Sequence, residues 1–257
     1  MRIWVASIIF YTTIYVFCEI LRFIVRKRLI NIPAQYVGFV NEFIGVVQVC
    51  APMFDVNVVL EHYGLQGVLI EITFIELVNA FVLRDALADP CPLIVDFMKK
   101  RVAIQELLIT IAVQFSGAYF SYLLVLAFWK IGVHSEHLHL LEKDCESDLT
   151  VTLLYGSLVE AGGCLLSKFA EHFMESRVSE QILRFSGALL SGIITVFGIH
   201  LTGMYANPLV AWACTFNCGE IPHLTHFVVY WVAPLVAWNV ADRLLHSEGE
   251  EKETKVE

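Results

Sequence analysis

Two short proline-containing motifs carry the residue types and spacing that are most informative about function in this chain of 257 residues. They are Asp89-Pro90-Cys91 and Asn207-Pro208-Leu209. Proline is well tolerated in the first turn of a helix, because the N–H group that it lacks would have no partner there. Asp and Asn are good caps for such a turn, because their side-chain oxygen accepts a hydrogen bond from its amides. Each motif therefore predicts the start of a short helix.

Two glutamates lie inside apolar stretches at matched distances before these motifs. Glu42 precedes Asp89 by 47 residues, and Glu160 precedes Asn207 by 47 residues. The equal spacing indicates an internal repeat with an offset of 118 residues. A carboxylate among apolar residues needs hydrogen-bond or charge partners, so we expect both acids to accept hydrogen bonds from the loops that carry the motifs. The alternative is a pair of unrelated acids.

The composition is typical of a membrane protein. Hydrophobic residues make up 57% of the chain and charged residues 17%, and the mean hydropathy is +0.66. In soluble domains about 45–50% of the residues are apolar and about 25% are charged. Crossing a bilayer takes roughly 20 mostly apolar residues. The predicted spanning helices are 3–25, 37–54, 68–83, 102–128, 149–169, 185–201 and 225–241. The chain is therefore predicted to be an all-α integral membrane protein in contact with membrane lipid.

The distribution of positive charge predicts the orientation. If the basic segment 22–28 is cytoplasmic, all of the 17 Lys and Arg residues except Arg2, Lys130 and Lys143 fall on the cytoplasmic side, as the positive-inside tendency requires. The N-terminus would then face the lumen or exterior, and the acidic tail 247–257 the cytosol. In an alternative arrangement of six spans, the first apolar block lies flat on the membrane as an anchor.

The repeat predicts a transport pathway. Each half would cross the membrane an odd number of times, so the second copy enters from the opposite face, and such inverted repeats place a pathway at their interface near the bilayer midplane. Non-helical backbone at that depth is tolerated only where protein buries it or where it lines a wet cavity. Two short helices that meet there would point their positive dipole ends at one place, which opposes the passage of cations.

Other kinds of site find no support in the sequence. The seven Cys residues are scattered without paired ligand spacing, so no metal site or cofactor is predicted. We find no arrangement of residues for nucleophilic catalysis, so an enzyme is not predicted. No surface for binding nucleic acid is predicted either. His134, His137 and His139 are interpreted as solvated loop residues, and Gly162, Gly163 and Gly187 as sites of close helix packing. Cys145 and Cys218 would share one side of the membrane, where they are either free or bridged.

The combination of motifs resembles the aquaporin superfamily over roughly residues 36 to 243. Its members carry two Asn-Pro-Ala boxes, an intramembrane Glu in each half and a Thr-Gly before the second box, here Thr202-Gly203. Two further resemblances are Gln114-Phe115-Ser116-Gly117-Ala118 and Tyr230-Trp231-Val232-Ala233-Pro234. Three departures are Cys91 in the first box, Val210 in place of an Arg, and the extra N-terminal span. They are similar to those of the unorthodox intracellular aquaporins, or superaquaporins.

The resemblance implies an inverted repeat of two three-helix halves, about 36–128 and 149–243, with two re-entrant half-helices. An extra N-terminal transmembrane helix with a basic cytoplasmic stub, residues 1–30, would precede this channel domain of residues 36–243. The resemblance also implies a homotetramer and a location in the endoplasmic reticulum or another intracellular membrane, with the plasma membrane as an alternative. The sequence contains no sorting signal that supports the location independently.

The substitutions bear on what such a pore would pass. Asp89 would act as a helix cap, as a protonated donor, or as an ionised carboxylate that only accepts hydrogen bonds and attracts cations. The resemblance assigns the selectivity constriction to Thr195, Met204 and Val210. Without the Arg this constriction is more apolar, which favours water or small neutral solutes such as glycerol-like molecules and hydrogen peroxide. The alternatives are a non-conducting structural or regulatory relative and a cation-permeable pore.

Overall fold

The computed structural model describes residues 2–254, and every regular element within them is helical. In chain order the elements are α1 (Ile3–Arg28), α2 (Ala34–Met53), α3 (Val56–Val82), α4 (Pro90–Met98), α5 (Ile104–Trp129), α6 (Ser135–Glu142), α7 (Leu153–Glu175), α8 (Glu180–Thr202), α9 (Pro208–Thr215), α10 (His223–Phe227), the π-helical turn η1 (Val228–Val232) and α11 (Ala233–Thr254). The prediction of an all-α fold is confirmed. Residues 255–257 of the predicted acidic tail lie outside the described residues.

Six segments are long and apolar enough to cross a membrane, namely α1, α2, α3, α5, α8 and the segment His223–Leu245 that ends within α11. The chain is thus an integral membrane protein. The sequence predicts a seventh span over α7, which is long enough but is not among the six. Glu160 and Lys168 lower the apolar character of α7, and both lie on the side of this helix that faces other parts of the chain.

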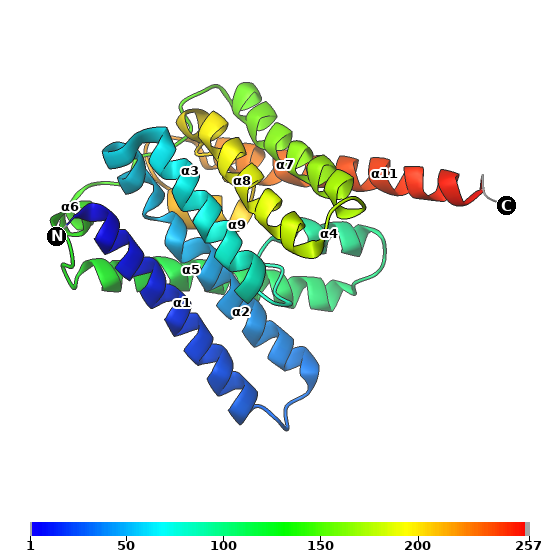
Figure 1. Ribbon diagram of the computed structural model, residues 1–257, viewed down its shortest axis with the longest axis horizontal. Coiled ribbons are helices and arrows are strands. Elements are labelled where there is room, and N and C mark those ends of the chain that lie inside the picture. Colours follow the sequence, from blue (N-terminus) through cyan, green and yellow to red (C-terminus); the bar gives the residue numbers. More distant parts are fainter. Residues whose placement is uncertain (1, 255–257) are drawn as a thin grey trace.

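The helices repeat in order. The series α2, α3, α4, α5 is followed by α7, α8, α9, α11, and the short helices α4 and α9 begin at the prolines of the two motifs, as predicted. Within the halves α2 packs against α5 and α7 against α11, while the contact of α3 with α8 joins the halves. The short helices α4 and α9 also contact each other. Figure 1 shows α3 and α8 running side by side.

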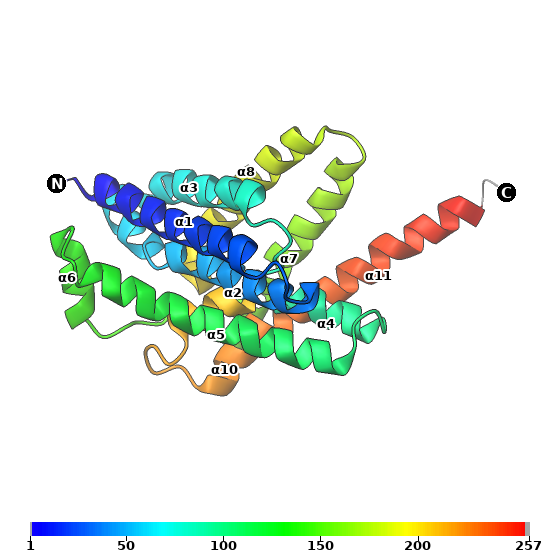
Figure 2. The same cartoon turned by 90° about the horizontal axis from the view of Figure 1, so that it is seen from below.

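The start of α1 and the end of α11 lie at opposite ends of the molecule. In Figure 2, α1 begins at the end that also carries α6, whereas α4 and the end of α11 lie at the other. This placement is compatible with the predicted orientation, in which the two termini face opposite sides of the membrane.

The extra helix α1 is an integral part of the bundle. Its residues Phe10 and Ile14 share an apolar cluster with Val47 of α2, Ile75 of α3 and Phe128 of α5. Within a membrane such close packing is a main source of helix association, because lipid is as apolar as the side chains themselves. The other face of α1 exposes large apolar residues such as Ile20 and Phe23.

The loop histidines differ from expectation. His139 is exposed, but His137 of α6 is fully buried and packs on the ring of Trp129. Its Nε2 lies 3.5 Å from Oδ1 of Asp55. The interpretation of all three histidines as solvated is therefore wrong for His137, because α6 folds back onto the helix bundle and covers it.

Cys145 and Cys218 form a disulfide, which resolves the alternative that the sequence left open. Their Cα atoms are 5.0 Å apart, and the bridge joins the segment before α7 to the segment after α9 across 73 residues. Gly219 N also donates to Cys145 O at 3.1 Å. The bridge therefore ties the loop that follows the second short helix to the start of the second half.

We expect the substitution Cys218→Ser to lower the melting temperature of the detergent-solubilised protein. A bridge that closes a loop of this length stabilises a fold by about 4 kcal/mol in the chain-entropy account. Thermal unfolding with and without reductant measures the effect, and Cys214→Ser, which removes a free cysteine one helical turn away, is the control. Efficient thiol labelling of Cys145 in the unreduced native protein would contradict the bridge.

Candidate pore loops

The two loops before α4 and α9 have matching local structure. Asp89 Oδ1 accepts a hydrogen bond from Cys91 N at 2.8 Å, and Asn207 Oδ1 accepts one from Leu209 N at 2.9 Å. The residues before them, Ala88 and Ala206, both have a positive φ, of 49° and 50°. Alanine adopts this left-handed conformation at a cost of roughly 1–2 kcal/mol, so the surroundings must hold each loop in place.

Glu42 of α2 holds the first loop. Its Oε2 accepts from Leu87 N at 2.8 Å, and its Oε1 accepts from Ala88 N at 2.9 Å and from Gln114 Nε2 at 2.8 Å. Glu42 is buried. The two amides lie outside any helix but within the bundle, so the carboxylate satisfies groups that would otherwise destabilise the loop.

Glu160 of α7 holds the second loop in the same way. Its Oε1 accepts from Thr202 Oγ1 at 2.6 Å and from Tyr205 N at 3.2 Å, and its Oε2 accepts from Ala206 N at 2.8 Å. Tyr205 and Ala206 are the repeat counterparts of Leu87 and Ala88, 118 residues further on. The matched spacing in the sequence therefore corresponds to a matched set of main-chain hydrogen bonds.

A glycine three residues after each glutamate lets the loop approach the helix. A Cβ atom on Gly45 would lie 2.4 Å from the Cβ of Ala86, and one on Gly163 would lie 1.7 Å from Cε of Met204. Ala86 and Met204 are again repeat counterparts. The expectation of close packing is thus confirmed for Gly163. It is wrong for Gly162 and Gly187, where an added Cβ would meet open space.

The two motifs are not equivalent in their side-chain bonds. Asn207 Nδ2 donates to the carbonyl of Ala88 at 2.9 Å, which joins the second loop to the first. The corresponding carbonyl in the second loop, that of Ala206, accepts from the thiol of Cys164 at 3.4 Å. An ionised Asp89 has no proton to donate, so the thiol on α7 occupies the place that a second asparagine amide would take.

The residues assigned to the constriction are all buried, but each has different neighbours. The Thr195 hydroxyl donates to Ser191 O of its own helix at 2.9 Å. The Met204 side chain packs against Gly163 and Gly198. Val210 belongs to an apolar cluster with Leu209, and the first-motif residue Cys91 is also buried.

Several contacts of the second loop were not foreseen. The Tyr205 hydroxyl donates to Asp148, which lies before α7 and also accepts from Asn57 Nδ2 at 3.1 Å. Burial raises the pKa of Asp148, and these two hydrogen bonds oppose the shift. Cys164 could have been suspected, because it lies one helical turn after Glu160 and on the same face. Asp148 carries no such signal, because it lies in the irregular segment between the halves.

The sequence is similar to those of several proteins named aquaporin. No protein-family profile matches the chain. Aquaporin-11 of Milnesium tardigradum is 26% identical over 227 residues, which cover 85% of this chain and 80% of the relative. Human aquaporin-11 is 26% identical (82% and 78% covered), and mouse aquaporin-12 is 25% identical (93% and 84% covered).

The chain is similar to aquaporins over most of its length. The resemblance to the superaquaporin-like subgroup is confirmed by these relatives. Its fold is also that of a solved aquaglyceroporin from Plasmodium falciparum, with a TM-score of 0.53, 18% identity, and coverage of 79% of this chain and 93% of the other. The chain therefore has the predicted fold, with α1 added before it.

We expect Gly45→Ala to destabilise the protein by about 1–3 kcal/mol, the usual cost of overpacking. The added methyl would overlap the Cβ of Ala86, which cannot move without its backbone. Gly162→Ala is the matched control, for which alanine should be neutral or stabilise α7 by up to about 1 kcal/mol. Thermal unfolding in detergent compares the two, and equal melting temperatures would show that loop and helix are not in close contact.

Proposed function

We propose that the chain is a passive transmembrane channel for water and small neutral solutes. The observation that carries this proposal is the meeting of two capped half-helices, each held by a buried glutamate through the same pair of loop amides. The bond from Asn207 to Ala88 O brings both motifs to one place. That arrangement binds and orients a passing molecule, and it involves no reactive nucleophile.

The midplane of the proposed pore is formed by the six motif residues Asp89, Pro90, Cys91, Asn207, Pro208 and Leu209. An amide carries two N–H groups, and Asn207 uses one of them on Ala88, so the other is available to a solute oxygen. Asp89 serves mainly as the cap of α4, because its Oδ1 already accepts from Cys91 N. The positive ends of α4 and α9 oppose cations at the same point.

The selectivity of the proposed pore follows from Thr195, Met204 and Val210. None of the three carries a charge, and the hydroxyl of Thr195 is already bound to its own helix. A constriction of this kind holds a solute weakly and without a strong donor, which suits glycerol-like solutes and hydrogen peroxide as well as water. The aquaporin names of the relatives support passage of small molecules in general.

The assembly and location are also proposals. We propose a homotetramer with one pore in each chain, in the endoplasmic reticulum or another intracellular membrane. In the proposed domain organisation, residues 1–30 form the added helix and basic stub, 36–243 the channel and 247–257 the tail.

Stopped-flow measurements on proteoliposomes test the channel. Vesicles that contain the full chain should exchange water, glycerol or hydrogen peroxide faster than empty vesicles of the same lipid. Under a membrane potential set by valinomycin and a potassium gradient, the same vesicles should show no flux of sodium ions or protons above that of empty vesicles. Equal rates in filled and empty vesicles would favour a non-conducting structural protein instead.

The two motifs should respond differently to an exchange of Asn and Asp. Asn207→Asp removes the donor to Ala88 O and adds a second carboxylate beside Asp89, so permeability should fall towards that of empty vesicles. Asp89→Asn keeps the cap oxygen and adds a donor, so permeability should be retained. A wild-type permeability in Asn207→Asp would mean that the loops do not form the pore, and a wild-type cation current that Asp89→Asn abolishes would establish a cation pore.

A further inference from the structure

The first half of the repeat carries buried polar residues where the second half carries exposed apolar ones. The polar residues on α2, on α3 and in the turn between them are Gln48, Asp55, Glu71 and Asn79. The residues 118 positions later are Leu166, Phe173, Leu189 and Phe197, with exposed fractions of 54%, 60%, 36% and 80%. Polar side chains inside a membrane are retained where they have a partner. The difference between the halves therefore marks one face of the first half as a specific contact surface.

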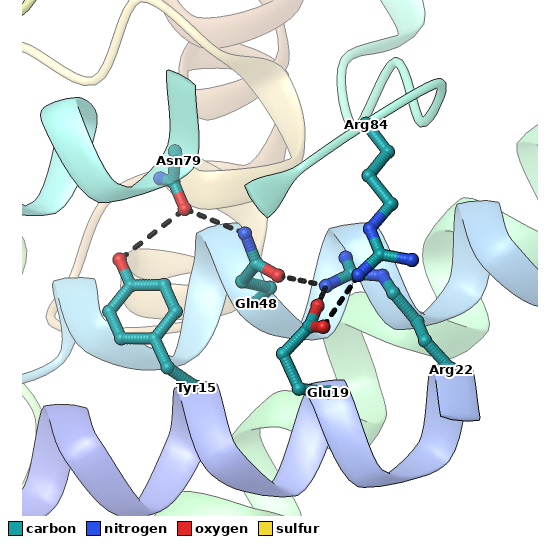
Figure 3. A network of polar contacts seen from close by, with 6 residues as sticks. All are labelled: Tyr15, Glu19, Arg22, Gln48, Asn79 and Arg84. Carbon is teal, nitrogen blue, oxygen red and sulfur yellow. Dashed lines mark hydrogen bonds and ion pairs between the residues drawn. The ribbon is translucent and has the colours of Figure 1, made fainter. Parts of the chain in front are cut away.

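The partner of this face is α1. The Tyr11 hydroxyl lies within hydrogen-bond distance of Asp55 Oδ2, at 3.0 Å, and of Glu71 Oε1. Figure 3 shows the network further along the helix, where Tyr15 donates to Asn79 Oδ1 at 3.3 Å and Gln48 Nε2 donates to the same atom at 3.0 Å.

The buried guanidinium of Arg22 completes the contact between α1 and α2. Its Nη1 donates to Gln48 Oε1 at 2.5 Å and to Glu19 Oε1 at 2.7 Å. Arg22 is only 2% exposed, so loss of these partners would leave a buried charge unpaired. The hydrogen bonds fix α1 in a single register against α2 and α3.

Glu19 extends this network to the first pore loop. Its second oxygen, Oε2, accepts from Arg84 Nη2 at 2.6 Å (Figure 3). Arg84 follows α3 directly after the C-cap residue Leu83 and stands at the start of the loop that leads to Asp89. Its φ of 60° is in the left-handed region, which costs a residue with a side chain roughly 1–2 kcal/mol. Such a conformation persists when its surroundings hold it.

The second loop is held differently at the equivalent position. The repeat counterpart of Arg84 is Thr202, whose hydroxyl donates to Glu160 and whose carbonyl accepts from Tyr230 Oη at 2.7 Å. The counterpart of Tyr230 in the first half is Ala112, which has no hydroxyl. The left-handed residue after α8 is Gly203, with a φ of 79°. The first loop thus lacks bonds that the second loop has, and Arg84 reaches α1 instead.

We propose that α1 is a positioning element for the first pore loop, with Glu19 as its contact residue and Arg84 as the residue through which it acts. The ion pair takes the place of the hydrogen bonds that Thr202 and Tyr230 make in the second loop. It also holds Arg84 in a left-handed conformation, which in the second loop is adopted by the glycine Gly203. The role of this positioning in permeation rests on the proposed function, but the positioning itself does not.

Hydrogen–deuterium exchange on the full chain in liposomes tests the proposal. Glu19→Gln and Arg84→Gln should each speed exchange in peptides that cover 83–89 by roughly 1.5-fold to fivefold, the range for loss of one partly exposed ion pair. Peptides that cover 203–206 should not change. The double variant should exchange no faster than Glu19→Gln alone, because Arg84→Gln removes an interaction that Glu19→Gln has already removed.

Glu180→Gln is the matched control, because it breaks a similar ion pair with Arg184 at the start of α8. If exchange in 83–89 is the same in Glu19→Gln, Arg84→Gln and this control, the proposal is overturned. Glu19→Gln also weakens the partner set of the buried Arg22, so Arg84→Gln, which leaves the bond between Glu19 and Arg22 intact, decides the matter if the first variant does not fold.

Permeability separates this inference from the proposed function. In a conducting channel, Arg84→Gln should lower solute flux per folded protein, and Arg84→Lys should retain most of it. Faster exchange in 83–89 together with no flux in the wild type would uphold the positioning role and overturn the channel. Unchanged exchange in 83–89 together with solute flux in the wild type would overturn the positioning role and uphold the channel.

Discussion

A backbone that leaves its helix inside a membrane must find hydrogen-bond partners within the protein, and two carboxylates provide them here. Glu42 and Glu160 each accept hydrogen bonds from two consecutive loop amides. Each also accepts one from a side chain, Gln114 for Glu42 and Thr202 for Glu160. The remaining features of the loops depend on these pairs. A glycine three residues after each acid gives the loop room to lie against the helix, and the Asx caps can then direct α4 and α9 towards each other. Removal of either acid would leave amides and a strained alanine without support.

The two halves have the same main-chain plan but different side-chain support. The second loop is held by residues of its own half and by Asp148 just before it, and a disulfide fixes the segment that follows α9. The first loop is held by Glu42 of its own half and also, through Arg84, by α1 outside the repeat. The extra helix therefore packs on the first half through polar contacts, and these contacts explain why α2 and α3 carry amides and acids on a face that would otherwise meet lipid.

The sequence was sufficient for the all-helical membrane fold, for the helix starts at Pro90 and Pro208, and for the repeat, because these depend on local residue types and on spacing. The physical reason to expect partners for Glu42 was also local, since a buried charge cannot remain unpaired. Contacts between distant segments were beyond reach. No residue near Glu19 in the sequence indicates that its partner is Arg84. His137 has polar sequence neighbours, so its burial, which arises only when α6 folds back, could not be predicted from them. The helix α7 is long enough for the predicted span, but Glu160 and Lys168 make it less apolar than the sequence pattern alone suggests.

The asymmetry between Asp89 and Asn207 fits this division of support. Asn207 can cap its own helix and donate to the opposite loop at the same time, because an amide has both an acceptor and donors. An ionised Asp89 can cap its own helix but has no proton to donate to the opposite loop. The Cys164 thiol donates to the corresponding carbonyl, that of Ala206, instead. The first loop thus has one bond fewer to the second half than it would have with an asparagine. An ion pair from α1 to the other end of the same loop supplies support at the place where the repeat itself provides least.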